Sequence, residues 1–126
     1  MNVDIKVLVV DDSIVSRRLI RVYLKKMGIT NVVEASNVKS AIENLKTETV
    51  DLILSDWSMP GMSGLNFLQF IRSDKHLKKI PFVMITAEGL KGSMAQALEE
   101  GVTKYVLKPY TYENIQNTIR SIYNKK

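Results

Sequence analysis

The sequence predicts an α/β fold, a single doubly wound sheet of five parallel strands in the order 2-1-3-4-5 with helices on both faces. Three observations predict this fold. Five short apolar runs alternate along the chain with five segments of helical periodicity. Several of the runs are continuously apolar, which is typical of strands that helices cover on both faces. The length of 126 residues is usual for one domain, so we expect residues 1–126 to form a single domain.

The apolar runs give the strands. Each run is short and ends at polar or turn-forming residues, which favours a strand over a buried helix. The predicted strands are Ile5 to Val10, Val32 to Ala35, Val50 to Ser55, Ile80 to Ile85 and Lys104 to Leu107.

A helix is predicted after each strand, because apolar residues recur there with helical spacing. Ser13 and Thr111 are expected to cap the first and last helices, and Gly28 and Gly101 to end the first and fourth helices. Five strands that each precede a helix favour the flavodoxin-like order, in which strands one and three are neighbours. The apolar stripes are Ile20/Tyr23/Leu24/Met27, Val38/Ala41/Ile42/Leu45, Gly64/Phe67/Leu68/Ile71, Met94/Ala97/Leu98 and Ile115/Ile119/Ile122.

The composition excludes several classes of function. The chain has no Cys, which excludes disulfides, thiolate catalysis and Cys-based metal sites, and a single His, His76, leaves no pair of imidazoles for a metal. The net charge is +5, but the cations are dispersed, which favours solvated helix faces over a nucleic-acid groove. No apolar run reaches the roughly 18 residues of a membrane span, and acids flank the first apolar stretch, unlike a signal peptide. We expect a cytoplasmic, monomeric protein without nucleic-acid or membrane partners.

Polar residues follow the strands at the edge where ligands of such sheets bind. Asp11 and Asp12 follow the first strand and Asp56 follows the third, so the three carboxylates are expected to meet. Two carboxylates about 4 Å apart repel by roughly 4 kcal/mol at an effective dielectric near 20. Lys108, after the fifth strand, supplies one positive charge, and Mg²⁺ is the natural second cation. Each Asp alone could be a cap or turn former, but capping does not require carboxylates to converge, whereas metal-assisted phosphoryl transfer does.

Four strings occupy these strand ends: V-L-V-V-D-D-S at 7–13, D-L-I-L-S-D-W-S-M-P-G-M-S-G at 51–64, M-I-T-A-E at 84–88 and Y-V-L-K-P-Y-T at 105–111. With all four in this order, the sequence resembles the receiver domains of bacterial two-component response regulators nearly end to end. Within that family it is most similar to the CheY-like chemotaxis type. The resemblance implies a receiver domain over residues 1–126 with no output domain.

The resemblance also implies roles for individual residues. Asp56 aligns with the phosphoacceptor, Asp11 and Asp12 with the acidic pair that holds Mg²⁺, and Lys108 with the invariant lysine. Asp56 and the backbone carbonyl of Ser58 would complete the metal site. Chemotaxis members often carry Asn where Ser58 stands, a departure that bears on the lifetime of the phosphorylated form.

The resemblance further implies a switch. Thr86 aligns with the conserved hydroxyl that reads the phosphoryl group, and Tyr105 with the aromatic that turns into the space below it. The alternative for Tyr105 is a half-buried strand tyrosine with a solvated hydroxyl. Trp57 is expected either beside the metal or in the core, His76 on the surface, and the Lys108–Pro109 bond in the cis form. The candidate output surface comprises Lys91, Glu99, Lys104, Tyr105 and Tyr112.

The function implied is a stand-alone response regulator, a binding switch rather than an enzyme. Its donor would be a phosphohistidine of a CheA-like sensor histidine kinase, or a small molecule such as acetyl phosphate. Its effector would be a flagellar motor switch protein. The alternative functions are those of a phosphorelay intermediate or of a single-domain regulator in another two-component pathway. An aspartyl-phosphate phosphatase is disfavoured because Ser58 and Ser13 stand where an acid is needed. A flavin protein is disfavoured because Asp11 and Asp12 would repel its phosphate.

Overall fold

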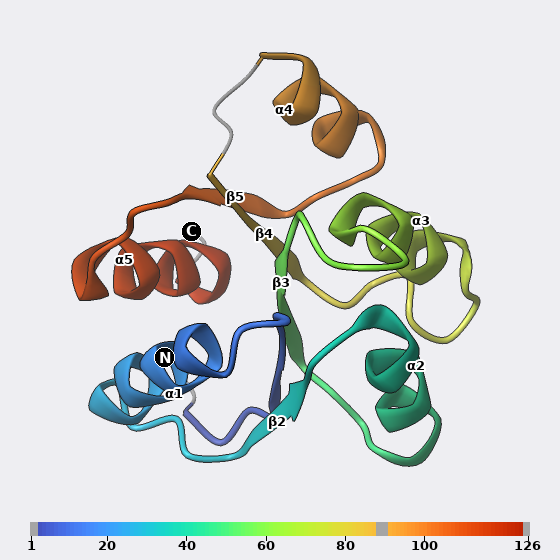
Figure 1. Ribbon diagram of the computed structural model, residues 1–126. Coiled ribbons are helices and arrows are strands. Elements are labelled where there is room, and N and C mark those ends of the chain that lie inside the picture. Colours follow the sequence, from blue (N-terminus) through green and yellow to red (C-terminus); the bar gives the residue numbers. More distant parts are fainter. Residues whose placement is uncertain (1–2, 88–90, 125–126) are drawn as a thin grey trace.

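The predicted parallel sheet is confirmed by the computed structural model, which describes residues 3–87 and 91–124. Over these residues five strands alternate with five helices (Figure 1). The strands are β1 Val7–Val10, β2 Val32–Ala35, β3 Leu52–Asp56, β4 Phe82–Thr86 and β5 Lys104–Leu107. The helices are α1 Ile14–Lys26, α2 Val38–Thr47, α3 Gly64–Ser73, α4 Lys91–Glu99 and α5 Tyr112–Tyr123. The sheet order is β2-β1-β3-β4-β5, so β1 and β3 are neighbours.

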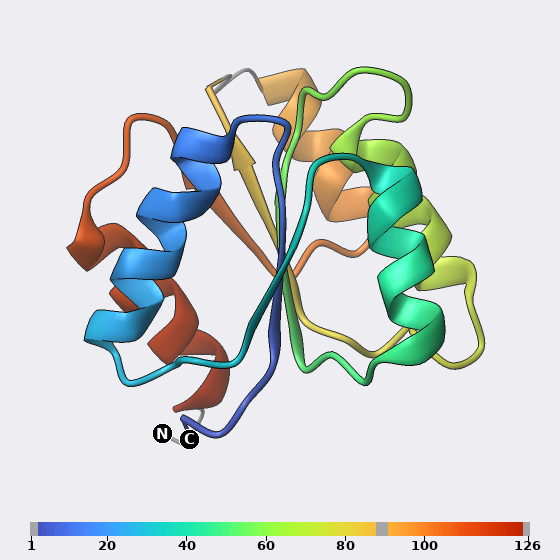
Figure 2. The ribbon, with the colours of Figure 1, turned by 60° about the horizontal axis from the view of Figure 1, so that its bottom comes forward.

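Helices cover both faces of the sheet and divide the core in two. Helices α1 and α5 lie on one face, while α2, α3 and α4 lie on the other (Figure 2). Along β1, Val7 and Val9 belong to the cluster under α1 and α5, whereas Leu8 and Val10 belong to the opposite cluster. This alternation explains why the strand is apolar at every position, because neither of its faces meets water.

Three predicted strand starts are wrong by two residues. Ile5, Val50 and Ile80 were expected to begin strands, but β1, β3 and β4 begin at Val7, Leu52 and Phe82. Ile5 and Val50 are nevertheless buried, each with 5% of its surface exposed. An apolar run therefore records burial, which starts before the strand joins its ladder. Ile80 instead closes a turn, in which its N–H donates to the Leu77 carbonyl.

The predicted helix boundaries agree with the structure. The Ser13 hydroxyl accepts from the Ser16 N–H at the start of α1, and Thr111 forms a capping box with Asn114 at the start of α5. Gly28 and Gly101 have φ of +88° and +87°, left-handed values that end a helix readily only at glycine. One member of the α4 stripe was wrong: Leu98 is 67% exposed, while Ala97 is fully buried. The side chain of Met94 lies outside the described residues.

Gly64, the first residue of α3, packs directly on the backbone at the end of β3. Its N–H donates to the Trp57 carbonyl at 2.7 Å. A Cβ at this position would overlap the Asp56 carbonyl oxygen and approach the Trp57 Cα to 2.9 Å. These two neighbours are main-chain atoms at the end of β3 and directly after it, so they cannot give way as a flexible side chain would.

We predict that Gly64→Ala lowers the free energy of unfolding by about 1–3 kcal/mol, because the added methyl must displace backbone. Gly61→Ala is the matched control, since a Cβ there meets nothing within 4 Å and only the backbone angle of φ +81° opposes it. Urea unfolding of both variants measures the difference. Equal stabilities for Gly64→Ala and the wild type would show that the loop accommodates the methyl.

Candidate functional site

Three carboxylates meet where β1 and β3 end side by side. Asp11 follows the last residue of β1, and Asp56 is itself the last residue of β3 rather than the first residue after it. Asp11, Asp12 and Asp56 each offer an oxygen, and these oxygens lie within 4.8 Å of one another. Asp11 and Asp56 are buried, whereas Asp12 is exposed. The structure thus brings together the three acids singled out in the sequence, with one of them open to solvent.

A lysine from the end of β5 partly neutralises this group. The Lys108 ammonium donates to Asp56 Oδ1 at 3.1 Å, and its backbone N–H donates to the Thr86 carbonyl. The Lys108–Pro109 peptide is cis, as the resemblance implied. Only 9% of the Asp56 side chain is exposed, so this ion pair is shielded from water far more than a surface pair. One lysine against three carboxylates leaves the site with an excess of negative charge.

The electrostatic balance is visible at Asp11. Burial raises the pKa of this carboxyl, the Ser13 N–H that donates to it opposes the rise, and the Asp56 carboxylate adds to it. The Ser13 N–H donates to Asp11 Oδ1 at 2.8 Å. A carboxyl with a raised pKa is one whose ionised form lacks sufficient compensation, and a bound cation would supply it.

The donor set fits Mg²⁺. This ion prefers carboxylate oxygens and water, at distances that place two bound oxygens at most about 4.2 Å apart. The oxygens of the three acids, all within 4.8 Å of one another, are near enough for side-chain movements to bring them around one ion. Beside Asp12 an open hollow of about 390 Å³ is lined by Trp57, Ser58 and neighbouring loop residues, which leaves room for water and a phosphoryl group.

The two predicted switch residues lie on the neighbouring strands. Thr86 ends β4 and is buried. Tyr105 lies in β5 opposite Met84 and packs against the core on the α3 face. Its ring is half-buried, and its hydroxyl oxygen is shielded from solvent, so the alternative of a solvated hydroxyl is wrong.

The structure also places Trp57, His76 and part of the expected output surface, and the predictions for them are only partly confirmed. Trp57 lines the hollow beside Asp12 and also packs on the core, so the packing interpretation is confirmed, and its place beside a metal stays a prediction. His76 is exposed in the turn after α3, at the opposite end of the sheet from the acids. Tyr112 packs against Tyr23 of α1, with ring centroids 5.7 Å apart, so this member of the expected output surface faces α1. Glu99 and Lys104 are exposed, and the side chain of Lys91 lies outside the described residues.

Sequence reasoning missed two side chains next to the acids. The dispersed cations, Arg17 among them, were expected on solvated helix faces, but Arg17 is largely buried and donates to the Asp11 carbonyl at 2.6 Å. Tyr110 packs edge-on against Tyr23, and burial together with the nearby Asp11 carboxylate raises the pKa of Tyr110 to about 12. Tyr110 was quoted only as part of a motif. For Arg17 the available signal was Glu34, an acid inside an otherwise apolar strand.

Comparison with known proteins gives consistent matches. Residues 7–120 match the family model described as response regulator receiver domain. The chemotaxis protein CheY of Pseudomonas aeruginosa is 37% identical over 120 residues, which cover 95% of this chain and 97% of that protein. The solved structure of the chemotaxis response regulator CheY4 of Vibrio cholerae has a TM-score of 0.86 and 30% identity, covering 94% of this chain and 98% of that one.

A third match bears on the fold. The receiver domain of a sensor histidine kinase from Pseudomonas aeruginosa, solved with a magnesium ion coordinated in its active site cleft, has a TM-score of 0.85. The match covers 96% of this chain and 98% of that one. At 23% identity this likeness shows the shared fold alone.

In the part of the chain that the structure describes, no helix has the length and apolarity that crossing a membrane requires.

We predict that Mg²⁺ changes the fluorescence of Trp57, the single Trp of the chain, because its ring lines the hollow beside Asp12. Asp12→Ala should abolish the response, since it removes the acid most open to solvent. Glu43→Ala is the control, because Glu43 is an exposed acid on α2 that pairs with Lys46. An undiminished response in Asp12→Ala would place the ion elsewhere.

Proposed function

Because the chain belongs to the family of response regulator receiver domains, we propose that it is a phosphorylation-controlled binding switch whose phosphoacceptor is Asp56. Receiver domains of the CheY kind are signalling proteins. The observation that carries the proposal is the convergence of Asp11, Asp12 and Asp56 around one edge of the sheet, with Lys108 bonded to Asp56. This arrangement supplies a nucleophile, an ion site and a fixed cation in one place.

The reaction moves one phosphoryl group. An Asp56 carboxylate oxygen attacks the phosphorus of a phosphohistidine, the new O–P bond forms as the P–N bond breaks, and the imidazole leaves. Asp11, Asp12, Asp56 and the Ser58 backbone carbonyl would hold Mg²⁺, which when bound would neutralise charge on the phosphoryl oxygens. Lys108 contributes a positive charge already positioned 3.1 Å from the nucleophile carboxylate. Such transfer depends on position and charge more than on acid–base chemistry, which suits a site without histidine.

The phosphoryl group is read out through Thr86 and Tyr105. A phosphorylated Asp56 carries three acceptor oxygens, and the Thr86 hydroxyl at the end of β4 donates to one of them. As Thr86 is drawn towards the phosphoryl group it leaves space below it, and the Tyr105 ring turns into that space. Thr86 and Tyr105 lie on adjacent strands, which supports this coupling. A nearly complete switch requires about 5.5 kcal/mol of differential stabilisation between the two states.

The partners follow from the chemistry and from the relatives. The donor is a phosphohistidine on a CheA-like sensor histidine kinase, and the effector is a flagellar motor switch protein. The identity of 37% to a chemotaxis CheY supports this pathway and a cytoplasmic location. Ser58 is exposed and lines the hollow beside Asp12, and its short side chain would leave a phosphoryl group on Asp56 open to water.

We predict that incubation with acetyl phosphate and Mg²⁺ adds one phosphoryl group to the wild type, detected by intact-mass analysis. The matched variant Asp56→Asn should gain none, because an amide cannot attack phosphorus as a carboxylate does. Chelation of Mg²⁺ should prevent the wild-type reaction. Equal uptake by both proteins would refute Asp56 as the acceptor.

A further inference from the structure

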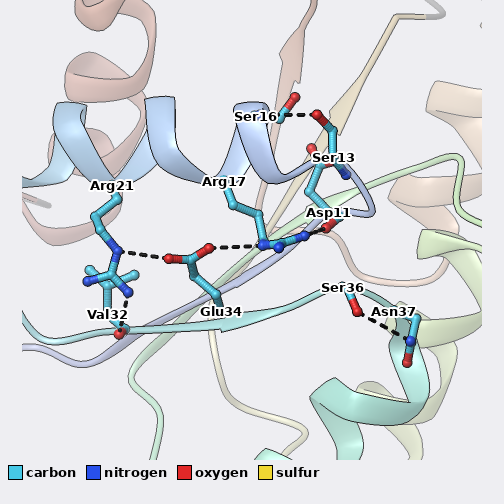
Figure 3. Close-up of polar contacts among 9 residues, drawn as sticks. All are labelled: Asp11, Ser13, Ser16, Arg17, Arg21, Val32, Glu34, Ser36 and Asn37. Carbon is cyan, nitrogen blue, oxygen red and sulfur yellow. Dashed lines mark hydrogen bonds and ion pairs between the residues drawn. The ribbon is translucent and has the colours of Figure 1, made fainter.

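Arg17 of α1 joins the acidic site to strand β2. Its Nη1 donates to the Asp11 backbone carbonyl at 2.6 Å, and its Nε donates to Glu34 Oε1 at 2.9 Å (Figure 3). Only 13% of the Arg17 side chain is exposed. A single guanidinium thus spans the loop after β1 and the middle of β2, which a planar fork of donors does well.

Glu34 is itself held from a second side. Arg21, one helical turn after Arg17, donates to Glu34 Oε2 at 2.9 Å and to the Val32 carbonyl. Partial burial would raise the pKa of Glu34, but the hydrogen bonds from Arg21 and Arg17 outweigh it and lower the pKa. Glu34 therefore stays ionised and fixes the direction of the Arg17 guanidinium (Figure 3).

The main chain of Asp11 is consequently fixed at both of its polar groups. Its N–H donates to the Ala35 carbonyl of β2, and its carbonyl accepts from Arg17. Asp11 is also one of the two buried acids in the group of three. We propose that Arg17, supported by Glu34, is a positioning residue that holds the Asp11 backbone so that its carboxylate faces Asp12 and Asp56.

The sign of a mutational effect separates positioning from charge. If Arg17 acted only as a nearby cation, its removal would strengthen the binding of Mg²⁺ to the acidic group. If it positions Asp11, its removal weakens binding, as loss of an outer partner of a metal ligand typically does by about 10-fold or more. The inference rests on the proposed function in that it takes these acids to be the ion site.

The experiment measures the Mg²⁺ dissociation constant through Trp57 fluorescence, with the melting temperature of each variant recorded in parallel. Arg17→Gln should weaken binding by about 10-fold. Arg17→Lys keeps the positive charge but lacks the planar guanidinium, so it should lose nearly as much Mg²⁺ affinity as Arg17→Gln. Arg18→Gln is the matched control: it removes the same charge from the adjacent, exposed position of α1, which has no hydrogen bond or ion pair to Glu34 or Asp11 among the described residues, so its affinity should stay within about twofold of the wild type.

Each outcome decides between the possibilities. If the Arg17 variants have lower melting temperatures but the wild-type Mg²⁺ affinity, then Arg17 has a structural role only. That result would overturn this inference and leave the proposed function standing. Tighter binding by Arg17→Gln would overturn it in favour of a simple charge effect. Should Arg17→Gln fail to fold, Arg17→Lys gives the same comparison at constant charge. A wild type that binds no Mg²⁺ would overturn the proposed function and this inference together.

Discussion

The structure depends on holding three carboxylates closer together than their charges favour. Asp11, Asp12 and Asp56 present oxygens within 4.8 Å of one another, and two of these acids are buried. Lys108 bonds to one of them, which leaves uncompensated negative charge that raises the pKa of Asp11 after burial has already done so. The crowded carboxylates destabilise the fold, and the same excess of negative charge favours the binding of a divalent cation. The proposed function builds on this property of the site.

The parallel sheet is what imposes the crowding. Adjacent parallel strands end at the same edge, and β1 and β3 are neighbours because the chain crosses over before β4 and β5 are added. The apolar clusters on both faces fix the strands, and the polar strand ends cannot retreat into them. Gly64 allows α3 to begin against the Asp56 backbone, and Arg17 ties the Asp11 backbone towards β2. The backbones of Asp11 and Asp56 are thus held by other elements, in addition to the hydrogen bonds that their carboxylates accept from Ser13 and Lys108.

The sequence predicted those features that repeat along it and missed those that arise from contacts between distant residues. Strand and helix order, the caps at Ser13 and Thr111, and the convergence of the acids follow from periodicity and from where polar residues end apolar runs. The starts at Ile5 and Val50 were wrong because burial extends beyond the ladder. Arg17 was mistaken for a surface cation because its partner, Glu34, lies 17 residues away on another strand. Tyr112 faces α1 because Tyr23 offers a ring to pack against, which no local pattern reveals.

The most direct test of the central claim is the free energy of unfolding with and without Mg²⁺, for the wild type and Asp12→Asn. Without the ion, we expect Asp12→Asn to be more stable than the wild type, because one of three crowded charges is gone. With saturating Mg²⁺ the order reverses, because only the wild type gains the full binding energy. If Mg²⁺ leaves the stability of the wild type unchanged, and the wild type is no less stable than Asp12→Asn without the ion, then the three carboxylates are neither destabilising nor a cation site.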